Sequence, residues 1–247
     1  MKPNFKFDGT DKYYFPNNKF ITHFFNALSA TFPGGEQFFV RAVRRYRNYD
    51  KGEFDLRIAK FMQEEAFHTI AHDSFNRYAE TYNIPIHQIQ KNVDEALKFI
   101  EKHISPIQCL AITSALEHHT AEMSKELLRT NHWLNQLEDE YKKLWEYHAI
   151  EESELSHCSL AFDLYKKQNR PEIEKNLIMI GATIILWIAL SIITAHFIYK
   201  DKDFTKLEVV TETYTGLKML LNGNNGFLYN VFKQIPKYLN KDFHPHN

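Results

Sequence analysis

Two segments of the chain carry a glutamate that is followed three residues later by a histidine. They are Glu65-Ala66-Phe67-His68 and Glu154-Leu155-Ser156-His157. Because residues three apart share one face of an α-helix, each pair can present a carboxylate and an imidazole to the same point. Both groups bind metal ions, so each segment is a candidate half of a metal site.

A further glutamate precedes each pair at a distance that suits two neighbouring helices. Glu36 lies 29 residues before Glu65 (65 minus 36), and Glu117 lies 37 residues before Glu154 (154 minus 117). At about 1.5 Å per residue, each separation fits two antiparallel helices and a short turn. A di-iron carboxylate site in a four-helix bundle uses this order of residue types. We therefore predict a two-metal site formed by Glu36, Glu65, His68, Glu117, Glu154 and His157.

The types of these residues indicate which metals would bind. Four carboxylates would compensate the charge of two divalent cations in a low-dielectric core. One imidazole per ion leaves open positions at which oxygen, water or a substrate can bind. Oxygen and nitrogen ligands favour two iron ions, with manganese or zinc as alternatives.

Three other residues are additional candidate ligands. His72 lies four residues after His68, on the same helical strip as Glu65, and is either a seventh ligand or a partner of one. His148 and Glu151 continue the three-residue spacing of Glu154 and His157. Each step of three residues turns about 60° around a helix, so these four side chains cannot all face one centre. Glu151 is thus the main rival of Glu154. Separately, Asp163 is a candidate partner that orients a ligand histidine.

The elements that must position these residues are predicted to be helices. Glycine and proline number only eight each, which disfavours a turn-rich β fold. Asn17 or Asn18 caps a first helix, the segment Pro33-Gly34-Gly35 ends it, and a new helix begins near Glu36. The later helices are expected over residues 53–81, 87–103, 106–128 and 131–167, followed by 177–199, 203–221 and 226–239. This is an all-α single domain, 1–247, with a metal-site core at about 34–168.

Four blocks of sequence carry a family resemblance. They are FPGGEQFF at 32–39, FMQEEAFHTIAH at 61–72, ALEHHTAE at 115–122, and WEYHAIEESELSH with AFDLY within 145–165. Together they resemble the bacterial family described as predicted metal-dependent hydrolases, which is grouped with the ferritin-like proteins. The resemblance implies a ferritin-like four-helix bundle core with additional C-terminal helices, and a metal-dependent hydrolytic activity.

Residues 177–199 form an apolar run without a formal charge, long enough to cross a bilayer as a helix. Gly181, Thr183, Ser191, Thr194 and His196 interrupt the run, which favours a buried bundle helix or an interface. A peripheral membrane contact or a homodimer could use this surface, and a membrane-spanning helix is the alternative. The N-terminus lacks a signal peptide and the two cysteines form no disulfide framework, so we expect a cytoplasmic protein that is either soluble or membrane-associated.

Composition and ligand types also limit the function. The net charge of −1 and the absence of a basic cluster disfavour nucleic-acid binding. The ligand set favours a di-iron oxidase or oxygenase that acts on a small apolar substrate. The alternatives are a hydrolase that uses a metal-activated water, as the family resemblance implies, and a non-catalytic metal-binding or scaffold protein.

Overall fold

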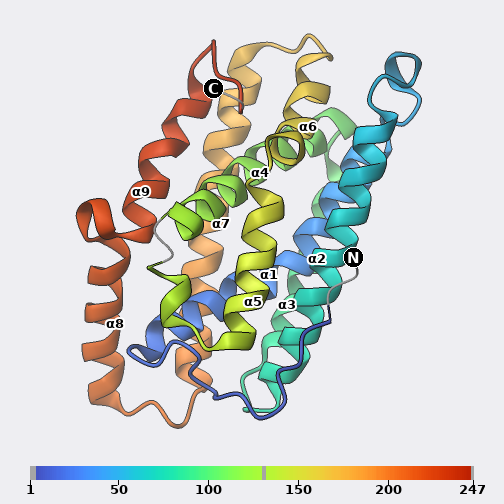
Figure 1. The fold of residues 1–247 in the computed structure, drawn as a ribbon. Helices are drawn as coiled ribbons and strands as arrows, with labels where there is room; N and C mark the ends of the chain where they lie inside the picture. Colours follow the sequence, from blue (N-terminus) through green and yellow to red (C-terminus); the bar gives the residue numbers. More distant parts are fainter. Residues whose placement is uncertain (1–3, 130–131, 246–247) are drawn as a thin grey trace.

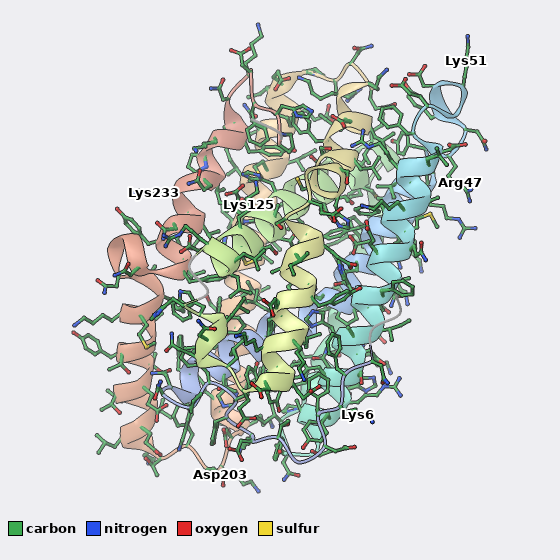
Figure 2. The ribbon with its side chains drawn as sticks, in the orientation of Figure 1. Lys6, Arg47, Lys51, Lys125, Asp203 and Lys233 are labelled. Carbon is green, nitrogen blue, oxygen red and sulfur yellow. The ribbon has the colours of Figure 1, made fainter. Side chains whose placement is uncertain are left out.

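The computed structural model describes residues 4–129 and 132–245, and within these ranges the fold is all-α (Figure 1). The first four helices are α1 (Lys19–Arg44), α2 (Asp55–Glu80), α3 (Ile86–His103) and α4 (Pro106–Arg129). They are followed by α5 (Asp139–Glu152), α6 (Leu155–Lys166), α7 (Glu172–Lys200), α8 (Lys206–Leu221) and α9 (Phe227–Gln234). Charged side chains such as Arg47, Lys125 and Lys233 project from the outside of this bundle (Figure 2).

The prediction of a break at Pro33 is wrong, because α1 continues through it. Asn18 does cap the helix, since its side-chain oxygen accepts a hydrogen bond from the Ile21 backbone N–H. Proline has no N–H, so the carbonyl of Ser29, four residues earlier, loses its helical partner. The side-chain amide of Asn76 on α2 donates to this carbonyl instead, at 3.0 Å. A tertiary hydrogen bond therefore replaces the missing helical one.

Gly34 has a packing role inside α1. A Cβ atom at this position would lie 3.1 Å from the backbone of Asp94 on α3, closer than ordinary side-chain contacts. Only glycine lets the two helices approach this closely without displacing one of them. The Pro-Gly-Gly segment thus positions α2 and α3 around a continuous helix.

The single helix predicted over 131–167 is also wrong. It is divided into α5 and α6, and Glu154 between them has extended backbone angles (φ −65°, ψ 128°) as the residue before α6. The helices predicted over 53–81, 87–103 and 106–128 agree with α2, α3 and α4 to within a few residues. The break at Ser153–Glu154 redirects the chain in the middle of the bundle.

Buried apolar residues form two clusters, and a polar layer lies between them. The larger core includes Phe25 and Phe75, and the smaller core includes Phe38 and Phe61. Along α1 the chain passes from the larger to the smaller core, and along α2 it returns. The residues between the two cores are Glu36 on α1, Glu65 and His68 on α2, Glu117 on α4, and Glu152 and His157 beside the α5–α6 break.

Helix α7 covers α1 and α4 with one side and leaves the other side exposed. In Figure 1 it runs behind α4. Only 22% of its most apolar stretch is buried, so of the two expected roles the helix buried on most sides is wrong, and the interface stays a prediction. Within the described residues it is the one helix long and apolar enough to span a bilayer, a test that core helices of soluble proteins also pass. The exposed stripe consists of Ile173, Leu177, Ile180, Ile184, Ile188 and Ile192.

Because Asn76 supplies the hydrogen bond that Pro33 removes, substitutions of these two residues should have coupled effects on stability. Asn76→Leu should lower the free energy of unfolding by about 1–3 kcal/mol, because the buried Ser29 carbonyl loses its donor. In a Pro33→Ala background the cost of Asn76→Leu should be smaller, since the backbone N–H that alanine restores can donate to the same carbonyl. Urea unfolding of the four proteins measures this difference. An equal cost of Asn76→Leu in both backgrounds would contradict the proposed replacement.

Candidate metal centre

Seven buried side chains from five helices form two adjacent groups that could each hold a metal ion. The first group is Glu36, His68 and His148, and the second is Glu65, Glu117, Glu152 and His157. Within each group the potential ligand atoms all lie within 4.8 Å of one another. All seven residues are at most 3% exposed.

Glu65 and Glu152 lie between the two groups. Glu65 Oε1 is 2.8 Å from His157 Nε2, and Glu65 Oε2 is 4.0 Å from His68 Nδ1. Glu152 Oε1 is 3.4 Å from His68 Nδ1, 3.5 Å from His148 Nε2 and 3.6 Å from His157 Nε2. Each of these two carboxylates can therefore contact ions in both groups.

Unpaired polar atoms gather in this cluster. Among the described residues, seven buried atoms of the cluster have no hydrogen-bond partner: Glu36 Oε1, Glu65 Oε2, His68 Nδ1, both carboxylate oxygens of Glu117, His148 Nε2 and Glu152 Oε2. Leaving a buried polar atom unpaired costs about 1–3 kcal/mol, and more for a charged one. Oxygen and imidazole nitrogen atoms that converge without donors fit a pair of divalent cations, which would satisfy several of them at once.

The candidate ligand histidines each use their second nitrogen for an outer partner. His68 Nε2 is 2.8 Å from Glu151 Oε2, and His157 Nδ1 is 3.1 Å from Glu64 Oε2. His148 Nδ1 is 2.8 Å from His72 Nε2. Such contacts fix the ring orientation of a metal-binding histidine and leave the other nitrogen aimed at the ion.

The comparison with protein-family models gives one match, to the family described as predicted metal-dependent hydrolase, over residues 2–247. The chain belongs to this family. No curated protein matches the chain, and no solved structure does. The family description and the two groups of buried ligands agree on metal dependence, and the resemblance stated from the sequence blocks is confirmed at the level of the family.

Burial and mutual repulsion disfavour ionisation of three of the four carboxylates, namely Glu36, Glu65 and Glu117. Burial, reinforced by the charge of Glu65, raises the pKa of Glu36 well above its ordinary value. Burial and the charge of Glu152 do the same for the pKa of Glu117. Burial opposes ionisation of Glu152 too, but His157 and His68 outweigh it and hold the pKa of Glu152 low. Cations bound between these groups would supply the positive charge that favours ionised Glu36 and Glu117.

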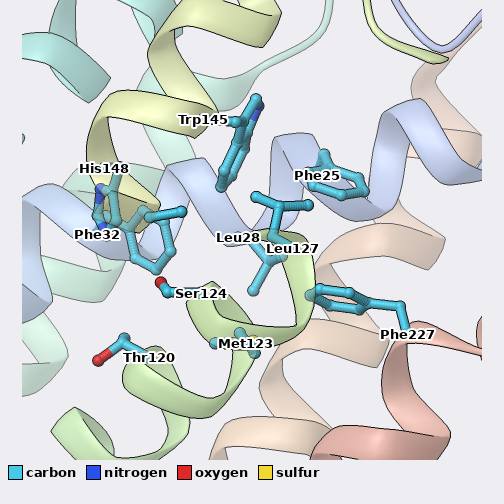
Figure 3. A pocket seen from close by; sticks show the side chains of 11 residues that line it. Phe25, Leu28, Phe32, Thr120, Met123, Ser124, Leu127, Trp145, His148 and Phe227 are labelled. Atoms are coloured by element: carbon cyan, nitrogen blue, oxygen red, sulfur yellow. The ribbon is translucent and has the colours of Figure 1, made fainter. Parts of the chain in front are cut away.

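His148 adjoins aromatic rings on one side and the carboxylates on the other. Its ring stacks on Phe32 with a centroid separation of 4.6 Å (Figure 3). Burial, together with the charge on His68, lowers the pKa of His148 to about 3, so the imidazole is neutral at physiological pH. Only the neutral form has a lone pair to offer a metal.

The structure does not place Glu154 in the cluster, although the Glu-x-x-His spacing predicts it there. Its side chain is 46% exposed, and its Oε2 is 2.6 Å from Lys60 Nζ. Glu152 takes its place. In a continuous helix Glu152 and His157, five residues apart, would point about 140° away from each other. The break between α5 and α6 brings both to the same centre.

The other candidates lie around the cluster. His72, expected to be either a seventh ligand or a partner of one, belongs to neither group. It lies between His148 and the Ser29 hydroxyl, at 2.8 Å from each, and is therefore a partner of a candidate ligand. Glu151 is the outer partner of His68. His148, the third additional candidate, is in the first group. Asp163 pairs with Arg57 and His244 and contacts no candidate ligand histidine through these bonds.

The position of Glu152 gives a direct mutational test. Glu152→Ala should remove most bound metal, because it deletes one of the two carboxylates that lie between the groups. Glu154→Ala should retain the metal content of the unmodified protein. Metal analysis by mass spectrometry after equal metal loading, with circular dichroism to check the helices, measures both. Full metal occupancy in Glu152→Ala would contradict this assignment.

Replacing Glu117 should stabilise the metal-free protein. A carboxyl group with a raised folded-state pKa contributes stability that is present below its unfolded pKa, near 4.3, and is lost as the pH rises toward the raised value. Glu117→Gln removes this loss. Relative to the unmodified protein, its free energy of unfolding should therefore rise by up to about 1.4 kcal/mol for each pH unit above the unfolded pKa. Urea unfolding of chelator-treated protein at pH 5 and pH 8 measures the gain, which should be larger at pH 8.

The matched control is Glu122→Gln on the same helix, where the side chain pairs with Lys125. It should show no gain that grows with pH. A Glu117→Gln protein whose stability relative to the unmodified chain does not change with pH would show that Glu117 ionises as freely in the folded state as in the unfolded one.

Proposed function

We propose that this protein is a two-metal enzyme in which each of the two groups would hold one ion, with Glu65 and Glu152 placed between the groups. The observation that carries the proposal is the convergence of seven unpaired buried ligand atoms at the centre of four helical rods, namely α1, α2, α4 and the α5–α6 pair. This ligand arrangement is similar to that of ferritin-like di-metal proteins. Its oxygen and nitrogen donors suit iron, manganese or zinc.

The apolar cavity beside the metal groups supports the proposal that the substrate is largely apolar. The cavity has a volume of about 420 Å³, and its walls include Glu36, His148 and Glu152 from the metal groups. Among the described residues, the other polar side chains in its lining are Thr31 and Thr120. A substrate in this cavity would have apolar surface against walls of aliphatic and phenylalanine side chains, with one end near Glu36, His148 and Glu152.

Hydrolysis is the reaction that the family description supports. A bound divalent cation would supply a water ligand of lowered pKa as the nucleophile. The protein's own part is to hold the ions with buried carboxylates, to keep bulk water out with the cavity walls, and to orient the substrate. His148, neutral and stacked on Phe32, is placed where the cavity meets the metal groups.

Oxidation of the substrate is a second candidate, favoured by one observation. Beyond the metal groups the cavity offers two threonine hydroxyls and no charged side chain to bind a polar leaving group. Iron in this donor set would supply redox chemistry with dioxygen. The substrate class is the same in both candidates.

Metal-loaded forms of the protein separate the two candidates. We expect zinc- or manganese-loaded protein to hydrolyse p-nitrophenyl dodecanoate, and Glu152→Ala to lose this activity while Glu154→Ala keeps it. Release of p-nitrophenol and consumption of dioxygen are followed in parallel for the zinc, manganese and iron forms. Absence of ester cleavage in all three, with dioxygen consumption by the iron form and an oxidised product, would replace hydrolysis with oxidation.

A further inference from the structure

The cavity beside the metal groups lies in a slot between two helices that share a neighbour. Both α3 and α7 pack against α1, yet they scarcely contact each other. The space between them is walled by Val93, Ala96, Leu97 and Ile100 of α3 and by one face of α7. The slot is therefore a gap in the packing of the bundle, bounded by helix faces on its long sides.

The cavity is elongated along the helices. Its lining on α7 recurs at helical spacing from Ile178 to Ala189, and its lining on α1 extends from Leu28 to Phe39. Each range covers eleven steps, or about 16 Å of helix at 1.5 Å per residue. A space of this length with a volume of about 420 Å³ is narrow, and it favours an extended ligand over a globular one.

Two glycines in the cavity lining leave space that larger side chains would fill. A Cβ atom at Gly181 on α7 would meet no atom within 4 Å, and one at Gly35 on α1 would meet only Phe39, at 4.0 Å. Protein cores are ordinarily packed closely enough to exclude such voids. Larger residues could be accommodated at Gly181 without a clash, so the size of this residue sets how much of the slot is empty.

The two ends of the cavity differ in exposure and in chemistry. At the outer side, Ile185 is 65% exposed and Ala96 is exposed as well. At the inner side, Glu36, His148 and Glu152 are at most 3% exposed. In the part of the chain that the structure describes, neither lysine nor arginine lines the space between them. A ligand could thus enter as an apolar chain and reach the metal groups without passing a cationic side chain.

We propose that this slot binds an unbranched hydrocarbon chain, and that the chain's functional group lies next to Glu36, His148 and Glu152. The inference rests on the proposed function for the role of that inner end, and it specifies the substrate as a molecule with a linear alkyl or acyl chain. Walls of aliphatic and phenylalanine side chains, the narrow shape and the absence of a cation among the described lining residues together favour such a chain over a compact, branched or anionic ligand.

The test uses unbranched primary alcohols, from hexanol to hexadecanol, and the chelator-treated full-length protein. Isothermal titration calorimetry should show a dissociation constant that falls about fourfold per added methylene until the slot is full, and then levels off. Adamantan-1-ol should bind at least tenfold more weakly than decan-1-ol, which has the same number of carbon atoms. Equal affinity for the two ten-carbon probes, or no dependence on chain length, would overturn the inference.

Two variants of α7 locate the binding site. Gly181→Leu should weaken binding of dodecan-1-ol at least tenfold, because the new side chain fills the slot. Ser191→Leu places the same side chain at an exposed position on the same helix, outside the cavity lining, and should leave the affinity unchanged. Unchanged affinity in Gly181→Leu would overturn the assignment of the chain to this slot.

The binding measurements need neither metal nor turnover, so they test the linear-chain inference separately from the proposed enzymatic function. Length-dependent binding together with an inactive metal-loaded protein would refute only the enzyme. Turnover of a metal-loaded protein that does not bind unbranched alcohols would refute only the linear-chain inference.

Discussion

Burial of four carboxylates at one point is the constraint on which the rest of the structure depends. Ionised carboxylates a few ångströms apart in a low-dielectric core repel strongly, and burial alone penalises each one. His68 and His157 outweigh this cost for Glu152, yet Glu36, Glu65 and Glu117 remain with raised pKa values. Two apolar cores on either side hold the polar layer in place, so the fold's packing energy maintains a cluster that is unfavourable without cations.

The order of residue types along the chain was enough to predict most of this layer, but not the local geometry of its last helix. Glu36, Glu65, His68, Glu117 and His157 come together as the spacing predicts, whereas Glu154 does not. The spacing rule assumes a continuous helix. The chain instead leaves helical geometry at Glu154, and no proline or glycine marks that position in the sequence. The pair Glu151-Glu152, which follows His148 within one helical turn, was the available signal for a ligand before the break.

The opposite error occurred at Pro33, where strong local signals predicted a break that tertiary contacts remove. Proline and two glycines lower helix propensity by several kcal/mol in isolation. In the folded chain Asn76 supplies the lost hydrogen bond, and Gly34 admits the backbone of α3. The partners of both contacts, on α2 and α3, are far away in sequence, and local propensity contains no information about them. Segment boundaries were therefore least predictable where the helices that build the site contact one another.

Helix α7 shows why composition alone left its role open. An uncharged run of this length suits a bilayer, a buried core or an interface equally well. The structure divides it into two faces: small and aliphatic residues around Gly181 line the cavity, and isoleucines on the other side are exposed. The small residues leave empty space beside α7. A helix that only had to pack closely against a core would carry larger side chains that fill this space. The chemical character of α7 thus follows from the cavity on one side, and its length follows from spanning both apolar cores and the polar layer between them.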